Sequence, residues 1–415
     1  MKTFLILGAG TAGTMIARKM AAHLDANHWK VIVVDKNDRH YYQPGFLFLP
    51  FGYYKEDDVV KPIRNFIAKG VEYIQAEVDQ LEPAQNRVTL ANGRVINYDY
   101  LVVATGTDIH PEETEGLKNG GWHQNIFDFY TFDGAMAMAP AISDFKGGRL
   151  VVNVVENPIK CPVAPLEFLF LADAYFTRKG IRSKVDIVYA TPLPGAFTKP
   201  VASSVLGKIL EKKHINVEAE FNAGVVDASR NILASYDERE ISYDLLVSIP
   251  LNKGASFLGA AGIGDELNHV RVDKQTLQST QFENIWALGD AANIPASKAG
   301  AVIHFQMETA YKNILQHMAG QSLTHHFDGH ALCYIETGFD KATLIDFDYT
   351  HQPFPGKYPV PGVGPFDLLG ETTVNHWGKL AFRHIYYMMM RGIEVPLPTD
   401  FSMSGKKQIL DQSPA

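Results

Sequence analysis

Cysteine is scarce in this chain: its 415 residues include two, Cys161 and Cys333. Two cysteines cannot form the disulfide framework that stabilises small secreted domains. We therefore expect any role that the pair shares to be chemical rather than structural. The alternative is two unrelated buried thiols, because a free cysteine is often a small core residue.

Basic clusters and long apolar runs are missing too. The 38 Lys and Arg residues are outnumbered by 46 Asp and Glu, for a formal net charge of -8. No run of basic residues resembles a nucleic-acid binding surface, so nucleic acid is not an expected partner. No segment reaches the roughly 18–20 uninterrupted apolar residues of a membrane span. The chain begins directly with a strand, and we expect no signal peptide.

The first 35 residues have a pattern that predicts a strand, a tight turn, a helix and a second strand. The run Phe4–Leu7 is followed by Gly8-x-Gly10-x-x-Gly13, and the second strand ends in Asp35. Gly8 permits the turn, Gly10 lets the backbone approach a pyrophosphate, and Gly13 allows close packing of helix and strand. The helix N-terminus holds negative charge, and an acid at this spacing suits a ribose. The pattern predicts a dinucleotide site; a glycine-rich turn without ligand would leave Asp35 unexplained.

Two later strands indicate which dinucleotide is bound. The stretch 98–107 ends in Ala-Thr-Gly, and 280–293 contains Gly289-Asp290. Together with the first motif, this pair resembles the two-dinucleotide-binding-domain flavoproteins over residues 1 to about 320. The resemblance implies FAD, with Asp290 on the ribityl chain. Asp290 could also cap the helix that follows, and the two roles are compatible.

The second nucleotide-binding turn that this fold would contain lacks glycine. The segment "ENPIKCPVAP" (156–165) follows a buried strand and has three prolines, each without a backbone N–H. A nicotinamide pyrophosphate needs accessible N–H groups, so we expect no NADH here. The turn presents Cys161 instead, which suggests that electrons enter through sulfur.

Four stretches together resemble the sulfide:quinone oxidoreductases: 41–52, 160–167, 333–347 and 376–382. The resemblance implies that Cys161 and Cys333 are the redox pair on one face of the flavin. Sulfide would attack a disulfide sulfur and leave a persulfide and a thiolate, with persulfide or polysulfide sulfur as product. Glu167 matches a carboxylate that moves protons there, its pKa raised by desolvation. Alternatively, Glu167 is an acidic residue in the first turn of a helix, where the helix dipole stabilises its negative charge.

Two departures from that family are visible. Many members have a third cysteine in the region that here reads "HQNIFDFYT" (123–131), and Phe127 is our expected replacement. With both remaining cysteines assigned to sulfur, we expect noncovalent FAD. The loop 192–200, where some members have a catalytic-site histidine, has none.

The segment 375–392 has helical periodicity. His376, Lys379 and Arg383 share one face of this helix, and apolar residues lie on another. The resemblance implies an interfacial helix, which would admit a membrane quinone, with basic residues attracting anionic lipid. A helix packed on the core or on a partner subunit is the alternative.

The resemblance also implies residue roles in this helix. Lys379 would lie near the pyrimidine end of the flavin, and Tyr334 and Phe382 would hold the quinone ring. We expect Trp377, Tyr386 and Tyr387 at the depth of the lipid headgroups.

Three histidines gather at 325–330. His326 and His330 are four apart, as in helical zinc pairs, but Gly329 breaks the helix. We expect His325, His326 and His330 to form a polar surface loop without metal.

We therefore predict an α/β fold of two Rossmann-like domains plus a C-terminal amphipathic, membrane-facing segment. The FAD-binding domain is expected at 1–110 and 250–325, the second domain at 111–249, and the quinone- and membrane-facing region at 326–415. The cofactor-binding residues are predicted to be Gly8, Ala9, Gly10, Gly13, Asp35, Lys36, Gln43, Pro44, Val78, Thr105, Gly106, Asp290, Gly300 and Lys379.

The predicted enzyme oxidises sulfide and passes two electrons to a membrane quinone. It would be a peripheral protein of the cytoplasmic membrane face, with a homo-oligomer as one option. One rival is a type-2 NADH:quinone dehydrogenase of the same fold, which the missing glycines oppose. The other is a non-catalytic flavin and thiol redox sensor that binds a partner through 375–392.

Overall fold

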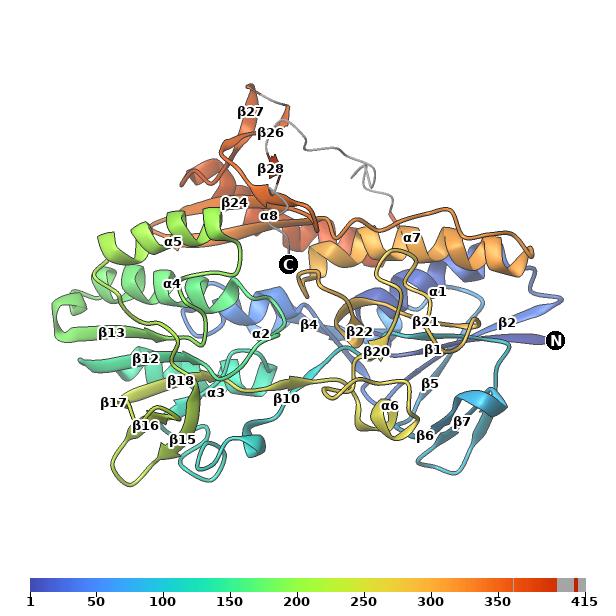
Figure 1. Ribbon diagram of the computed structural model, residues 1–415, viewed down its shortest axis with the longest axis horizontal. Helices are drawn as coiled ribbons and strands as arrows, with labels where there is room; N and C mark the ends of the chain where they lie inside the picture. Colours follow the sequence, from blue (N-terminus) through green and yellow to red (C-terminus); the bar gives the residue numbers. More distant parts are fainter. Residues whose placement is uncertain (361, 394–406, 410–415) are drawn as a thin grey trace.

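The first layered unit is built on a parallel sheet at the N-terminal end of the molecule. The computed structural model describes residues 1–360, 362–393 and 407–409. In the first sheet the strand order is β21-β9-β1-β2-β5, all parallel. The helices α1 and α7 pack against each other and run along this unit (Figure 1). The bounds are β1 Lys2–Leu7, β2 Trp29–Asp35, β5 Val71–Gln75, β9 Tyr100–Val103, β21 Ile285–Ala287, α1 Thr11–His23 and α7 Gly300–Met318.

A second parallel sheet lies beside the first, with the order β11-β18-β12-β13-β14. Its two central strands are mostly apolar and are buried over 150–154 and 245–249, as expected for strands covered on both faces. The polar residues Asn153 and Ser248 in these stretches hydrogen-bond each other at 3.3 Å. Its elements are β11 Ile126–Phe127, β12 Gly148–Val154, β13 Val185–Ala190, β14 Asn216–Glu218, β18 Leu245–Ile249, α3 Phe132–Asp144, α4 Ala164–Arg178 and α5 Pro200–Lys212.

Smaller elements complete the two units. The chain passes between them twice, at β10 and β19, which pair antiparallel. The others are β3 Arg39–Tyr41, α2 Glu56–Val59, β4 Val60–Pro62, β6 Val78–Glu82, β7 Arg87–Leu90, β8 Val95–Asn97, β10 Asp108–Ile109, β15 Ala223–Asp227, β16 Ile232–Ser235, β17 Glu240–Ser242, β19 Asn252–Lys253, α6 Ser256–Ala260, β20 Val270–Arg271 and β22 Ala292–Asn293, with 3₁₀ turns that include Gln43–Phe48.

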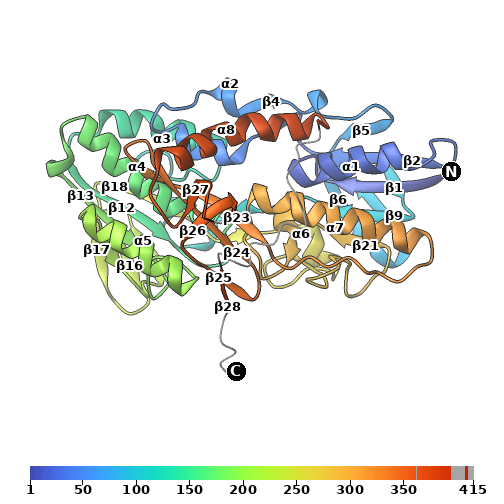
Figure 2. The same ribbon diagram turned by 90° about the horizontal axis from the view of Figure 1, so that it is seen from above.

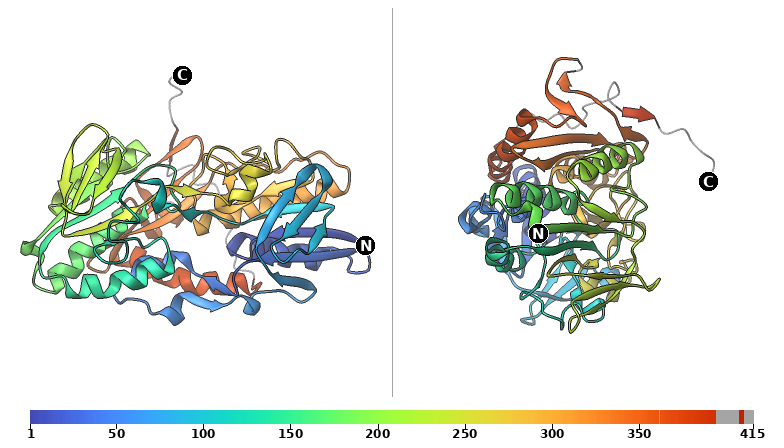
Figure 3. Two further views of the ribbon diagram at one scale, coloured as in Figure 1. Left: turned by 90° about the horizontal axis from the view of Figure 1, so that it is seen from below. Right: turned by 90° about the vertical axis from the view of Figure 1, so that its left-hand side faces the viewer.

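The C-terminal region adds a third sheet, ordered β23-β24-β27-β26, and the helix α8. Strand β23 packs on α4 of the second unit and also meets α7 of the first. The hairpin of β26 and β27 projects from the body (Figure 1; Figure 3, right). The bounds are β23 Ala331–Gly338, β24 Lys341–Phe347, β25 His351–Pro353, β26 Gly356–Val360, β27 Gly364–Leu368, α8 Thr373–Met390 and β28 Lys407–Ile409.

Helix α8 runs along one side of the molecule next to α2 and β4 (Figures 2 and 3). Hydrogen bonding agrees, because the Tyr387 hydroxyl donates to the carbonyl of Asp58 in α2 at 3.0 Å. Within the described ranges, none of the helices is both long and apolar enough to cross a bilayer. The predicted α/β class with two Rossmann-like units is confirmed by this topology.

Candidate functional site

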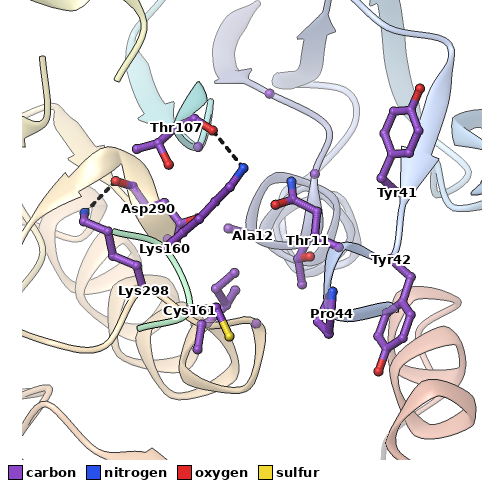
Figure 4. Close-up of a pocket in the computed structure, with 18 of the residues that line it drawn as sticks. Thr11, Ala12, Tyr41, Tyr42, Pro44, Thr107, Lys160, Cys161, Asp290 and Lys298 are labelled. Atoms are coloured by element: carbon purple, nitrogen blue, oxygen red, sulfur yellow. Dashed lines mark hydrogen bonds between the residues drawn. The ribbon is translucent and has the colours of Figure 1, made fainter. Parts of the chain in front are cut away.

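A cavity of about 920 Å³ lies where the three sheets meet. Its walls come from the turn after β1, the Gln43–Phe48 turn, the loop of Cys161, the N-terminus of α7, β23 and α8. Figure 4 shows part of this wall, with Thr11 and Ala12 of α1 opposite the loop of Cys161. Segments far apart in the sequence therefore line one cavity.

The glycines of the first turn have separate tasks, and their surroundings test whether a dinucleotide fits. A Cβ on Gly13 would lie 1.8 Å from the Gly8 carbonyl oxygen, so Gly13 permits the close packing of α1 on β1. Gly8 has a φ of +98°, which side-chain-bearing residues rarely adopt. A Cβ on Gly10 would meet no protein atom within 4 Å. The space above Gly10 and the α1 N-terminus is thus open to the cavity, as a pyrophosphate requires.

Asp35 at the end of β2 holds this turn in shape. Its Oδ2 accepts a hydrogen bond from the Ala9 N–H at 2.7 Å, and its Oδ1 accepts one from the Asn37 N–H at 2.8 Å. The carboxylate also lines the cavity, where a ribose would lie. Of the predicted cofactor residues, Gly13 stands behind the turn. The others line the cavity: Gly8, Ala9, Gly10, Asp35, Lys36, Gln43, Pro44, Val78, Thr105, Gly106, Asp290, Gly300 and Lys379.

The turn after β12 is built around Cys161. This residue has a φ of +47°, a conformation that costs free energy outside glycine and persists where contacts fix it. Its N–H donates to the Lys298 carbonyl at 2.6 Å, and its own carbonyl accepts from the Tyr130 hydroxyl at 3.1 Å and the Ala164 N–H at 2.9 Å. The neighbouring Lys160 donates to the Thr107 carbonyl at 3.3 Å (Figure 4). The turn is therefore fastened to the first unit.

Both cysteines line the cavity, although 172 positions separate them in the sequence. Burial raises the pKa of the Cys161 thiol; Glu167 and Cys333 raise it further, and Lys379 opposes them. Burial likewise raises the pKa of Cys333 to about 12, again opposed by Lys379. Lys379 is thus the cation that favours the thiolate of either cysteine.

Glu167 and Lys379 form a buried ion pair beside the cysteines. The Nζ of Lys379 donates to Oε1 of Glu167 at 2.6 Å and to the Tyr334 carbonyl at 3.0 Å. The same Oε1 accepts from the Glu336 N–H at 2.9 Å. Burial raises the pKa of Glu167, opposed by Lys379. Burial lowers the pKa of Lys379, but Glu167 outweighs it and the net shift is upward. Lys379 therefore holds its proton firmly, while the Glu167 carboxylate takes a proton more readily than an exposed one.

Helix α8 turns its polar side inward. Lys379 meets Glu167, and Arg383 contacts Asp58 at 2.5 Å. Tyr386 is buried and hydrogen-bonds the Thr11 hydroxyl at 2.8 Å. Tyr386 is therefore not at a lipid surface, and the expectation that Lys379 and Arg383 attract lipid is wrong, because both are used internally. The exposed side of the helix is mostly apolar and comprises Val374, Trp377, Ala381, His384 and Met388.

Two other expectations need correction. Phe127 lies in β11 within the hydrophobic core, while Phe129 and Tyr130 reach the cavity. The reason is strand pairing: β11 ends at Phe127, and the chain turns toward the cavity only beyond it. His330 is not on a surface loop. It is buried, lines the cavity and bonds Asp346 at 2.9 Å.

Sequence reasoning also missed Phe305, Tyr358 and Phe366, all of which line the cavity. The sequence held a signal for the His330 contact. Asp346 is a single acid in the otherwise apolar run "ATLIDF", and a charge in a buried strand needs a partner. The sequence held no similar signal that the three aromatic residues line the cavity, because aromatic side chains are common in any protein core.

Comparisons with known proteins agree with this geometry. Residues 2–136 match the family described as pyridine nucleotide-disulphide oxidoreductase. The mitochondrial sulfide:quinone oxidoreductase of Mus musculus is 29% identical over 396 residues, covering 94% of this chain and 86% of that protein. The solved sulfide:quinone oxidoreductase of Aquifex aeolicus has a TM-score of 0.79 at 19% identity, covering 95% of this chain and 92% of the other.

A type II NADH:quinone oxidoreductase of Staphylococcus haemolyticus is 30% identical, but only over 119 residues, covering 28% of this chain and 29% of that protein. The similarity to NADH enzymes is therefore partial, whereas that to sulfide:quinone oxidoreductases spans nearly the whole chain. The resemblance expected from sequence is thus confirmed, and the chain is an FAD-dependent oxidoreductase of the two-dinucleotide-binding flavoprotein fold that is similar over most of its length to the sulfide:quinone oxidoreductases.

Proposed function

We propose that this protein oxidises sulfide through Cys161 and Cys333 and passes the electrons to a membrane quinone. The observation that carries the proposal is that both cysteines line the cavity into which the glycine turn opens. A buried Glu167–Lys379 pair stands beside them. A dithiol, a proton acceptor and a fixed cation are the groups that sulfur oxidation requires.

The sulfur step uses groups of this chain. A hydrosulfide ion attacks one sulfur of a Cys161–Cys333 disulfide; a new S–S bond forms, the old one breaks, and a persulfide and a thiolate result. Lys379 stabilises the thiolate, and Glu167 takes the proton of the persulfide or of incoming sulfide. Bound FAD would accept the two electrons that the sulfur gives up. Loss of these two electrons joins the outer persulfide sulfur to the freed thiolate, and each further round of hydrosulfide attack and two-electron oxidation adds one sulfur to the bridge, which lengthens it to polysulfide.

FAD is held without a covalent bond in this proposal. A thioether link needs a cysteine near the flavin, and both cysteines of the chain are assigned to the redox pair. Many members of the family have a third cysteine in the segment that here is 123–131. Phe129 and Tyr130 of this segment line the cavity. Acid precipitation should therefore release all flavin into the supernatant, and a yellow pellet would contradict noncovalent binding.

Quinone would enter from lipid, with Tyr334 and Phe382 against its ring. Supporting this, the exposed side of α8 is mostly apolar, and Trp377 is 62% exposed. The projecting hairpin of β26 and β27 adds Val360 and Val363, the latter 76% exposed. Apolar surface of this kind on an otherwise charged protein suits a peripheral contact with the membrane surface, which we propose on the cytoplasmic face.

An NADH-dependent reaction is disfavoured by the Cys161 turn. The Cys161 N–H is already bonded to Lys298, and Pro158, Pro162 and Pro165 have no N–H to offer a pyrophosphate. The test is anaerobic titration of the purified flavoprotein. Sulfide should bleach the flavin absorbance and a soluble quinone should restore it over many cycles, whereas NADH should not. Bleaching by NADH alone would overturn the proposal, and a single turnover would favour a redox sensor.

A further inference from the structure

Strand β23 divides the cavity wall into two faces. Neighbouring residues of a strand point to opposite sides. Cys333 and Ile335 belong to the large core that includes α4. Leu332 and Tyr334 belong to a separate apolar cluster with residues of β24, β26 and β27. The sulfur chemistry and the second face are therefore separated by the thickness of one strand.

The second face carries an aromatic slot, defined here as Leu332, Tyr334, Tyr358 and Phe366. The Tyr334 and Phe366 rings meet edge to face at 5.6 Å, and the Tyr358 and Phe366 centroids are 6.2 Å apart. All four residues line the cavity. The slot is closed by Gly378 of α8, where a Cβ would lie 2.7 Å from the Tyr334 hydroxyl. An apolar wall of flat rings fits a planar, largely apolar ligand.

A buried histidine and aspartate stand on the same face as the slot. Asp346 lies directly opposite Leu332 in the β23–β24 register, and cross-strand partners share a face. His330 is 5% exposed, Asp346 is 1% exposed, and Nε2 of His330 is 2.9 Å from Oδ1 of Asp346. Burial raises the pKa of Tyr358, and the Asp346 charge adds to that increase, which places Asp346 near the slot.

His330 also faces the cavity. Its ring stacks on Phe305 of α7 with centroids 4.5 Å apart, and both residues line the cavity. The Asp346 carboxylate fixes Nε2 as the bonded nitrogen, so Nδ1 is the nitrogen left to a ligand. A carboxylate-held imidazole is a common proton donor in enzymes. The ligand recognised here would combine a flat apolar ring with an oxygen that accepts a proton.

We propose that the aromatic slot holds the quinone ring and that His330 is the catalytic residue that protonates one quinone oxygen, with Asp346 as its positioning residue. This inference rests on the proposed function. The quinone in the slot takes up the two electrons that sulfide gives up at the cysteines on the other face of β23. One oxygen forms an O–H bond with the Nδ1 proton of imidazolium His330, which is left neutral and regains a proton from solvent. Asp346 keeps its charge throughout, and the second oxygen takes its proton from solvent.

A purely structural role for the pair is the competing explanation, since a buried histidine needs a partner in any fold. The two roles differ in their response to the electron acceptor. Ferricyanide takes electrons without protons, whereas a quinone takes both. A catalytic His330 therefore matters for quinone and not for ferricyanide, while a structural defect would affect both acceptors alike.

The experiment uses the full-length holoprotein with His330→Ala, Asp346→Asn and the control His351→Ala. His351 bonds Asp348 at 2.9 Å in a similar pair two residues beyond Asp346 but does not line the cavity. After reduction by sulfide, reoxidation by a short-chain ubiquinone analogue is followed by stopped flow. We expect about a 100-fold slower rate for His330→Ala and about 10-fold for Asp346→Asn. The His351 variant should match the wild type.

Two further readouts separate the possible outcomes. Added imidazole should restore quinone reoxidation in His330→Ala, and reoxidation by ferricyanide should be normal without it. Equilibrium binding of the same analogue to oxidised Phe366→Ala protein should weaken several-fold. A wild-type quinone rate in His330→Ala, or equal slowing with both acceptors without imidazole rescue, would overturn the assignment. Failure of sulfide to bleach even the wild-type flavin would instead overturn the proposed function.

Discussion

Each of the two units contains a strand, a turn and a helix in succession, β1 to α1 in the first and β12 to α4 in the second, yet the two turns use their backbones in opposite ways. In the turn after β1, glycines have no side chains to cover the backbone, and a Cβ on Gly10 would meet no protein atom within 4 Å. After β12, the Cys161 N–H is bonded within the protein to Lys298. The backbone N–H groups of the first turn are therefore available to a ligand. The Cys161 N–H of the second turn instead forms a hydrogen bond that holds one unit to the other. One fold can thus bind a nucleotide with its first turn and present a thiol with its second.

The comparison also separates backbone from side-chain function. The first turn works through N–H groups and the helix dipole, which any sequence with the right glycines provides. In the proposed function the second turn works through one sulfur, which needs a carboxylate, a cation and a second thiol at defined places. Those partners come from α4, α8 and β23. Substitutions should therefore be tolerated differently at the two turns.

The largest effect is expected from removing either thiol. Cys161→Ser and Cys333→Ser should each abolish reduction of the flavin by sulfide, because a hydroxyl cannot form a persulfide or exchange with a disulfide. FAD should stay bound, since the glycine turn is untouched. Stopped-flow absorbance with sulfide measures the loss, and flavin content per protein is the control. If both single variants are reduced at the wild-type rate, the cysteines are not the redox pair.

Next in size is the loss of cofactor from the glycine turn. Gly10→Ala should keep the fold, because its Cβ meets no protein atom, but should lose most FAD by blocking the pyrophosphate. Gly13→Ala should instead destabilise the protein itself, since its Cβ would lie 1.8 Å from the Gly8 oxygen. Flavin content and the melting temperature of the apoprotein distinguish the two. A Gly10→Ala protein with full FAD would show that the cofactor does not approach this turn.

The third effect is electrostatic and concerns the Glu167–Lys379 ion pair, which has no counterpart at the first turn. Lys379→Met removes the cation of a buried pair, which costs about 3–5 kcal/mol while Glu167 is ionised. Lys379 lowers the pKa of Glu167, so its loss moves that pKa further above the unfolded value. The folded variant then binds a proton that the unfolded chain has lost, and its stability falls as pH rises.

The melting temperature of Lys379→Met should therefore drop further below the wild type at pH 8 than at pH 5. The double variant with Glu167→Gln has no carboxylate left to protonate, and its deficit should be the same at both pH values. A deficit of equal size at both pH values in the single variant would show that Glu167 is not its source.

The sequence predicted the first turn more fully than the second. The positions of Gly8, Gly10, Gly13 and Asp35 are set by local rules of strand, turn and helix, so spacing alone located them. The placement of Cys161 and Cys333 on the wall of one cavity depends on long-range packing of β23 on α4, and only the family resemblance pointed to it. The helix α8 was predicted in part. Lys379 and Phe382 line the cavity as expected, but Arg383, which was expected to attract lipid, pairs with Asp58, and Tyr386 is buried.

A tenfold effect is expected at the apolar side of α8. Trp377→Ser removes an exposed aromatic side chain, and if about half of it enters lipid, roughly 1.4 kcal/mol of binding is lost. Sedimentation with liposomes should show about tenfold weaker binding. Tyr386→Phe, on the buried side of the same helix, is the matched control and should bind normally. Because Lys379 and Arg383 are paired internally, added salt should weaken binding only slightly. Equal binding by both variants would leave α8 as an ordinary packing helix.

The smallest effect concerns the transfer of electrons to quinone, in which Phe382 rather than the Cys161 turn is proposed to take part. Phe382→Ala removes one aromatic wall from the cavity while keeping the helix, because Phe382 lies between turns held by Lys379 and Tyr386. Losing one aromatic contact of about 1 kcal/mol should weaken quinone binding about fivefold. Reduction by sulfide should stay nearly normal, because the thiols and Glu167 are unchanged. Stopped-flow reoxidation at several quinone concentrations separates affinity from rate, and a rise in the half-saturating concentration alone is the expected pattern. Unchanged quinone kinetics would move the ring-binding wall elsewhere, whereas slowed reduction by sulfide would show that the two faces of the cavity are not independent.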